Sequence, residues 1–187
     1  MEKEKIIIRN ELITDFEKET MLFMGHIKSH IAEKFASDIK IFEEKKTELI
    51  TLRFACFGGL NEPIQDHMND IFRNSKIWFE GYNSGFAYSA AALIIQFCHW
   101  RSAAPNRKMM IHWPVPIDQD GNTTSSEPIS KEHEEWWYDI FAARSGKSIS
   151  FIKSIAHLKL PAEECLKYNL IDQITEKPMR PKIKITP

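Results

Sequence analysis

Apolar residues form two kinds of pattern along the chain, and the two kinds alternate. Short apolar runs typical of buried strands cover residues 20–24, 48–57, 76–80 and 108–112. The stretches between them, residues 27–42, 63–72 and 90–100, repeat apolar positions at about the helical period. The last of these stretches is apolar almost all round, so we expect it to be buried. This alternation predicts an α/β fold with a largely parallel sheet and right-handed crossovers.

The second half of the chain predicts a polar loop followed by helices. Residues 117–127, between Pro116 and Pro128, are polar and are expected to form an exposed loop. Ser130 can cap a helix of residues 131–144, which Ser145 and Gly146 would end. Two shorter helices are expected, one from Ser148 and one from Pro161.

Both ends of the chain predict less regular structure. Residues 1–19 are interpreted as an N-terminal arm, with a possible strand at residues 6–13. Residues 175–187 are basic and rich in proline, which predicts a surface tail. Within that tail, residues 182–186 alternate like an edge strand that could add to a neighbouring subunit, and a tail without structure fits equally well.

Composition limits the class of protein. The 187 residues, 43% of them hydrophobic, fit a single domain with a substantial core. A formal net charge of -1 gives no field that favours nucleic acid or an anionic membrane. The N-terminus lacks a signal-peptide core and no run approaches a membrane span, so we expect a cytoplasmic protein. Cys56, Cys98 and Cys165 are widely spaced in apolar surroundings, which indicates buried thiols rather than a disulfide framework or a zinc site.

Three segments carry residues suited to acyl transfer. Ser89 stands between small residues at the start of an apolar helix, and His112 closes an extended apolar run. Gly58 and Gly59 end another apolar run. Because ligand crevices of parallel sheets lie beyond the carboxyl ends of the strands, we expect these segments to converge. Ser89 would then be the nucleophile and His112 its base, while the N–H groups of Gly59 and Ala90 would hold an oxyanion.

Simpler explanations exist for the same residues. Ser89 could be a small residue that allows close helix packing, and His112 could be a core histidine with satisfied hydrogen bonds. Cys98 and His99 are neighbours on a helix and point about a quarter-turn apart, so a core cysteine is favoured over a thiol nucleophile. The segment after His133 has Trp137 where a zinc-protease helix needs a second histidine. Residues 118–121 lack the register of a calcium loop.

The order and spacing of these motifs resemble the proteolytic subunit of Clp proteases over residues 21–174. The carrying motifs are Gly58-Gly59, then Gly85-Phe-Ala-Tyr-Ser89-Ala-Ala-Ala, then Pro105-Asn-Arg-Lys-Met-Met-Ile-His112-Trp-Pro114. Residues 145–148 and 161–172 resemble that family's closing helices. The resemblance implies a single domain of the Clp protease and crotonase type, built from repeated β-β-α units around a mainly parallel sheet. It also implies a handle-like loop and helix at residues 115–145.

Carried over position by position, the resemblance gives Ser89 as nucleophile, His112 as general base, and Gly59 and Ala90 as oxyanion donors. The family's third catalytic residue is usually an aspartate, and His157 stands at that position here. A neutral imidazole can accept the base's N–H, but it stabilises an imidazolium less than a carboxylate does. Ser-His-His arrangements occur in herpesvirus-type proteases. We therefore expect a weak or tightly regulated serine endopeptidase. The alternative for His157 is an ordinary surface or packing residue.

The resemblance also implies assembly and partners. It implies a homo-oligomeric ring that takes peptides or unfolded proteins, needs no cofactor, and could receive substrate from an ATP-driven unfoldase. Cys56-Phe57 replaces the family's usual Ser-Pro before the glycine pair, and the polar segment after His112 replaces a glycine-rich strand. The first departure changes the wall beside the oxyanion hole. The second removes the segment by which two rings of the family interlock.

Two other functions fit parts of the sequence. One is a catalytically silent subunit that builds or regulates a ring, which the His157 departure favours. The other is a crotonase-type acyl-CoA enzyme, in which paired backbone donors hold a thioester enolate. The chain lacks an evident glutamate pair beside those donors, and the spacing of Ser89 and His112 argues against this second function.

Overall fold

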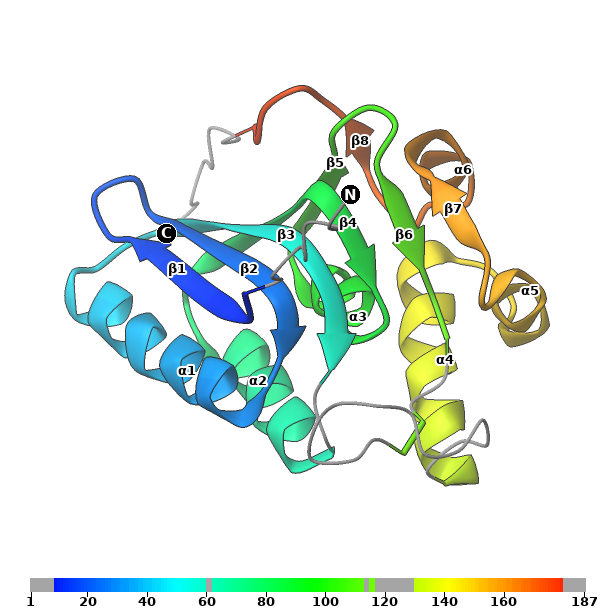
Figure 1. The fold of residues 1–187 in the computed structure, drawn as a ribbon, viewed down its shortest axis with the longest axis horizontal. Coiled ribbons are helices and arrows are strands. Elements are labelled where there is room, and N and C mark those ends of the chain that lie inside the picture. Colours follow the sequence, from blue (N-terminus) through cyan, green and yellow to red (C-terminus); the bar gives the residue numbers. More distant parts are fainter. Residues whose placement is uncertain (1–8, 60–61, 113–114, 117–129, 180–187) are drawn as a thin grey trace, which may run out of the picture.

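The computed structural model describes residues 9–59, 62–112, 115–116 and 130–179, and these form a layered α/β structure (Figure 1). The strands are β1 (Glu11–Asp15), β2 (Thr20–Ile27), β3 (Leu49–Gly59), β4 (Trp78–Tyr88), β5 (Trp100–Ala103), β6 (Lys108–Met110), β7 (Lys159–Pro161) and β8 (Gln173–Ile174). The helices are α1 (Ser29–Glu44), α2 (Glu62–Asn74), α3 (Ala90–Phe97), α4 (Lys131–Ser145), α5 (Ile149–Ile155) and α6 (Ala162–Lys167).

All of these strands belong to one sheet, whose main path runs β1-β2-β3-β4-β5-β8. Strand β4 has two successive partners along one edge. Its first half pairs with β5 through residues 80–83, and its last three residues pair with β6. The pairs β1–β2 and β6–β7 are antiparallel, while the other pairs are parallel. The mainly parallel α/β sheet expected from the sequence is therefore confirmed.

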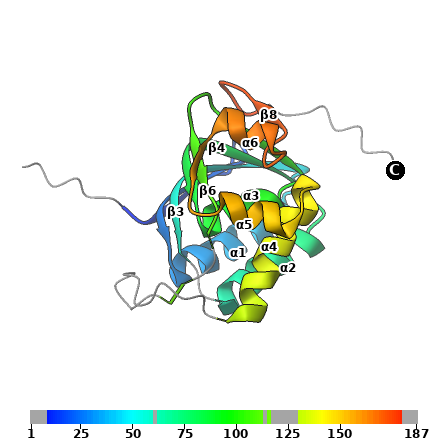
Figure 2. The same cartoon turned by 90° about the vertical axis from the view of Figure 1, so that its right-hand side faces the viewer.

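Helices α1, α2 and α3 lie to one side of the central strands (Figure 2). The core between them is rich in aromatic rings. Phe23 of β2 stacks on Phe54 of β3 with ring centroids 5.2 Å apart, and it also contacts Phe35 of α1. Phe72 of α2 meets Phe79 of β4 edge-on at 4.8 Å. These rings tie three helix–strand units together.

Two predicted elements of the central region are wrong in their bounds. The strand expected at residues 76–80 continues to Tyr88, because β3 and then β5 or β6 pair with it on both sides. The helix expected at residues 90–100 ends at Phe97, since Trp100–Ala103 is drawn into the sheet as β5. Gly81 fits where α3 packs on β4, because a Cβ there would lie 3.0 Å from Cys98 Sγ.

The helices of the second half begin within one residue of the positions that the sequence predicts. The Ser130 hydroxyl accepts the His133 N–H at 3.0 Å at the start of α4, and Gly146 ends that helix in a left-handed conformation. The Ser148 hydroxyl caps α5 in the same way, and Pro161 precedes α6. The expected loop of residues 117–127 and the expected edge strand of residues 182–186 lie outside the described residues. Among the residues described, no helix combines the length and the apolar character that crossing a bilayer requires.

The first part of the expected tail is attached to the sheet. The Tyr82 hydroxyl contacts the carbonyl oxygens of Thr175 and Glu176, and the Met179 N–H donates to the Glu80 carboxylate at 2.8 Å. Glu80 is fully buried and also accepts from the Thr51 hydroxyl at 3.1 Å. This segment therefore covers the buried Glu80 carboxylate and supplies one of its donors.

Candidate active site

Ser89 occupies a strained backbone position at the entrance to α3. Its φ and ψ are 55° and -125°, a combination that residues with a side chain seldom adopt. The Ser89 N–H donates to the carbonyl oxygen of Met110 at 2.9 Å, which ties the turn to the end of β6. The residue is half-buried. The strand–turn–helix geometry therefore lifts the serine out of the sheet at the edge where β4 and β6 end.

Gly58 packs directly against this turn. A Cβ on Gly58 would lie 2.7 Å from the Ser89 Cβ and 2.8 Å from the Ala90 nitrogen, and φ at Gly58 is 89°. No residue other than glycine fits this contact without moving the turn. The Gly58 N–H is used internally, because it donates to Cys56 Sγ at 3.4 Å.

Gly59 and Ala90, the expected oxyanion donors, lie at the same edge. Gly59 has φ of 115°, and a Cβ there would collide with the backbone of Ile27 on β2. Ala90 is the first residue of α3, so its N–H has no acceptor within the helix. The positive end of the helix dipole also lies at this position and favours a negative charge there.

His112 and His157 are neighbours across the end of the sheet. Their ring centroids are 5.8 Å apart, and the ring planes differ by 30°. The His157 backbone N–H donates to the carbonyl oxygen of Ile111 at 2.6 Å, so the turn after α5 is fixed to the residue that precedes His112. His157 has φ of 66° and is exposed, whereas His112 is half-buried.

Two backbone hydrogen bonds therefore gather the three side chains expected to carry chemistry. One joins Ser89 to the residue two before His112, and the other joins His157 to the residue directly before it. A serine, an imidazole and N–H groups at a helix start are the components that acyl transfer requires. The convergence expected from the sequence exists in the fold, while the catalytic roles of Ser89, His112, His157, Gly59 and Ala90 stay predictions.

The cysteines are unsuited to act as nucleophiles. Burial raises the pKa of the Cys56 and Cys165 thiols to about 12, so both stay protonated at neutral pH. Burial also raises the pKa of Cys98 strongly, and the thiol of this residue, which directly follows α3, donates to the Ile94 carbonyl of that helix. Within the described residues, no group of His, Cys, Asp and Glu is arranged to hold a metal ion.

Sequence reasoning missed an aromatic group beside Ser89. The centroid of the Phe57 ring lies 4.5 Å from that of Phe86 and 6.3 Å from that of Tyr88. The same ring stacks on His26, with the two centroids 5.2 Å apart. Lys159 Nζ lies 5.6 Å from the centre of the Tyr88 ring. The i, i+2 spacing of Phe86 and Tyr88 on a strand was the available signal, because it puts both rings on one face. Phe57 and Tyr88 directly precede Gly58 and Ser89, so these rings border the candidate site.

In architecture the molecule is an α/β protein of the type found in Clp proteolytic subunits. A family model described as Clp protease matches residues 3–178. The chain belongs to the Clp protease family, whose members are serine peptidases. No curated protein matches it in sequence.

Solved structures agree with this assignment in fold. The crystal structure of the ClpP protease catalytic domain from Plasmodium falciparum shares 18% identity at a TM-score of 0.71, covering 90% of this chain and 91% of that chain. ClpP1 from Listeria monocytogenes and a point mutant of it each share 22% identity at a TM-score of 0.73, covering 87% of this chain and 94% of theirs. At these identities the likeness establishes the fold.

Proposed function

We propose that this chain is a serine endopeptidase in which Ser89 attacks the peptide carbonyl and His112 moves the proton. The observation that carries the proposal is the strained Ser89 turn, hydrogen-bonded to β6 two residues before His112. The unfavourable backbone conformation of Ser89 lowers the stability of the fold, and residues in such conformations concentrate at functional sites.

The proposed reaction follows the acyl-enzyme route. The Ser89 hydroxyl forms a bond to the peptide carbonyl carbon while the His112 imidazole accepts its proton. The N–H groups of Gly59 and Ala90 hold the oxyanion, and loss of one such donor costs roughly 3 kcal/mol in other enzymes. His112 then gives the proton to the leaving amine. Water repeats the sequence and releases the acyl group from Ser89.

His157 is the proposed orienting partner of His112. Its ring lies 5.8 Å from the His112 ring, measured between centroids. An imidazole there supplies less charge than the family's usual aspartate, so the imidazolium of His112 is stabilised less. A slow peptidase is the expected result.

The proposal extends to assembly and location. The family takes peptide or protein substrates and assembles into oligomers. For this chain we infer a cytoplasmic homo-oligomeric ring that degrades peptides or unfolded proteins, with an ATP-driven unfoldase as the partner that delivers them. Residues 1–187 would form one domain, in which residues 1–19 are an arm and residues 115–145 a handle.

A catalytically silent, structural or regulatory ring subunit is the second candidate. The exposure of His157, at a position where buried carboxylates do the orienting in other triads, favours it.

A fluorophosphonate probe on the purified full-length protein separates the two candidates. Such a probe phosphonylates an activated serine, so the peptidase is expected to be labelled at Ser89. Labelling should vanish in Ser89→Ala and fall at least 100-fold in His112→Ala. Ser84→Ala is the matched control, because Ser84 lies on the same strand and its hydroxyl donates to the Phe54 carbonyl at 3.1 Å.

Mass spectrometry of the labelled peptide identifies the site. An oligomer that takes no probe at Ser89 would favour the silent subunit. Equal labelling of wild type and His112→Ala would remove His112 from the mechanism.

A further inference from the structure

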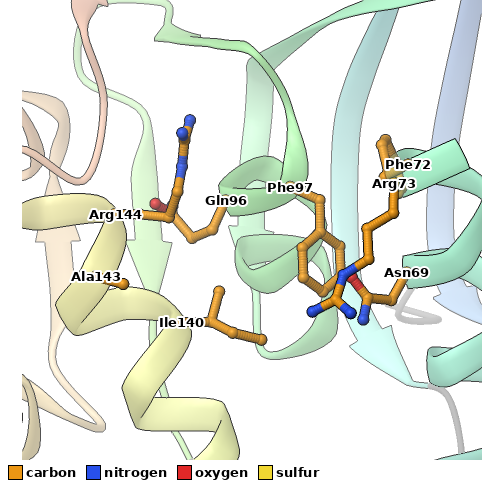
Figure 3. Close-up of a pocket in the computed structure, with 8 residues that line it drawn as sticks. All are labelled: Asn69, Phe72, Arg73, Gln96, Phe97, Ile140, Ala143 and Arg144. Atoms are coloured by element: carbon orange, nitrogen blue, oxygen red, sulfur yellow. The ribbon is translucent and has the colours of Figure 1, made fainter. Parts of the chain in front are cut away.

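The C-terminal end of α3 borders a pocket that the proposed reaction does not use. It has a volume of about 280 Å3 and lies between α2, α3 and α4 (Figure 3). Phe97, in its wall, is eight residues beyond Ser89, which is about 12 Å along a helix. The pocket is therefore at the opposite end of α3 from the candidate active site.

One part of the lining is apolar and rigid. Phe72 and Phe97 form it, with ring centroids 5.7 Å apart, and Phe72 is held in the core by Phe35 and Phe79. Ile140 and Ala143 of α4 form the facing wall (Figure 3). These walls offer apolar surface to a flat or branched apolar side chain of a ligand.

The polar part of the lining is cationic and carries no acidic residue. Arg73 and Arg144 contribute the charges, and Asn69 and Gln96 contribute amides. Two of these four are already engaged: Arg144 Nη2 donates to the Cys98 carbonyl at 2.7 Å, and Gln96 bonds to Arg101 and to the Leu170 carbonyl.

Arg73 and Asn69 are not engaged in this way. Neither side chain makes a hydrogen bond or ion pair within the part of the chain that the structure describes. Asn69 is only 8% exposed, and its amide lines the pocket beside Arg73 and Phe97 (Figure 3). The Asn69 amide is not among the fully enclosed polar atoms that lack a partner within the described residues, so it stays accessible from the pocket and can bond to a ligand there.

We propose that this pocket binds the free carboxyl terminus of a peptide whose last residue is apolar. The carboxylate pairs with the Arg73 guanidinium and accepts from the Asn69 amide, and the terminal side chain packs on Phe72 and Phe97. The volume is at the lower end of the range of ligand pockets, roughly 300–1,000 Å3, so it holds one residue. Arg73 and Ala143 are exposed, which leaves a side of the pocket open for the rest of the peptide.

Binding to the full-length Ser89→Ala protein tests this proposal without any cleavage of the peptide. The probe is a fluorescein-labelled pentapeptide that ends in Phe, measured by fluorescence anisotropy and compared with the same peptide amidated at its carboxyl terminus. We expect the free acid to bind at least tenfold more tightly than the amide, because the charge-assisted hydrogen bonds are lost with the carboxylate. Arg73→Gln should weaken binding of the acid by a similar factor, and Arg73→Lys by less, since lysine keeps the charge without the fork.

Lys76→Gln is the matched control, because Lys76 is an exposed cation just beyond the same helix and outside the pocket. It should bind like the parent protein. Equal affinity for acid and amide, or full affinity in Arg73→Gln, would overturn the proposal. An altered oligomer mass of Arg73→Gln in native mass spectrometry, with unchanged peptide affinity, would also overturn it and would assign Arg73 to a subunit contact. Because Ser89 is absent from this assay, its outcome is independent of the probe labelling described above.

Discussion

Helix α3 has different surroundings at its two ends. At the N-terminal end, backbone atoms fix the geometry: Ser89 is tied to Met110, and Gly58 fills the space beside it with no room for a Cβ. At the C-terminal end, side chains dominate, and two of them, Asn69 and Arg73, have no partner within the described residues. A rigid backbone suits the placement of reacting atoms, whereas unpaired side chains suit the capture of a ligand. One short helix therefore separates a candidate reaction site from a candidate binding site.

The largest effect is expected from Gly58→Ala at the N-terminal end. The new methyl group would overlap the Ser89 Cβ and the Ala90 nitrogen, and φ at this position is 89°. We expect Ser89 labelling to fall at least 100-fold, because both the nucleophile and an oxyanion donor shift. We also expect about 3 kcal/mol lower stability. Urea unfolding and labelling kinetics measure the two effects.

Gly146→Ala is the matched control for Gly58→Ala. Gly146 also has a positive φ, of 69°, but a Cβ there meets nothing within 4 Å. It should cost about 1 kcal/mol and leave labelling unchanged. Equal losses in the two variants would mean that backbone conformation alone, and not the contact with Ser89, explains the effect.

At the C-terminal end, the second largest effect is expected from Asp172→Ala. Asp172 Oδ1 accepts from Arg101 Nη2 at 2.6 Å, and Oδ2 accepts from both Nε and the backbone N–H of Arg101. The Arg101 side chain is only 5% exposed, so it would become a buried charge without its carboxylate. We expect the free energy of unfolding to fall by about 2–3 kcal/mol, somewhat less than for a fully buried pair.

Glu135→Ala controls for this ion-pair effect. Glu135 lies 4.0 Å from Lys131 on the exposed side of α4, and both side chains are more than half exposed. Such surface pairs contribute roughly 0–1 kcal/mol. If Glu135→Ala and Asp172→Ala had the same midpoint of urea unfolding, burial of Arg101 would not be what makes the second pair strong.

A smaller effect is expected at His157. In the candidate active site at the N-terminal end of α3, this histidine stands where the family usually has an aspartate. His157→Asp should raise the rate of Ser89 labelling on the order of tenfold, because a carboxylate stabilises the imidazolium of His112. His157→Ala should lower the rate by a comparable factor. His30→Ala, an exposed histidine on α1, serves as the control in stopped-flow measurements. An unchanged rate in both His157 variants would exclude this residue from the reaction.

The smallest effect is expected on the pH dependence of stability, through His99, which lies two residues beyond the end of α3. Burial, and then the charge of Arg144, lower the pKa of His99, whose Nδ1 accepts the Phe79 N–H at 3.0 Å. The unfolded chain therefore binds the proton more readily than the folded one. The contribution of neutral His99 to the free energy of unfolding is therefore fully present above about pH 6.5, and it decreases as the pH falls below that value. His99→Asn keeps an acceptor but cannot titrate, so its thermal midpoint should fall less between pH 7 and pH 5.

Sequence patterns predicted the layered fold because each strand and helix there follows its own periodicity. Apolar spacing in residues 27–42 and the serine caps at residues 130 and 148 are local signals, and the corresponding helices formed. Strand β4 shows the limit of such signals. Its segment Gly81-Tyr-Asn-Ser-Gly85 has the composition of a turn, yet pairing on both sides keeps it extended. Strands β7 and β8 are only three and two residues long, and their partners, not their composition, define them.

The functional sites also have a part that the sequence predicted and a part that it did not. Motifs and their order predicted that Ser89, His112 and the glycine pair would converge at one sheet edge. The pocket at the other end of α3 could not be predicted, because Asn69, Phe97 and Ile140 come from three helices with no common motif. Which polar groups lack partners is a property of packing, and no single segment of the sequence encodes it.

The attachment of Met179 to the buried Glu80 carboxylate has a consequence for synthesis of the chain. A ribosome releases β3 and β4 long before residues 173–179, yet those late residues supply both the strand that pairs with β5 and a donor to Glu80. Until they emerge, the nascent sheet has an open edge and a carboxylate that water must still solvate. Completion of the sheet is therefore expected to wait for residues 173–179, and until they emerge the growing chain is exposed to chaperones.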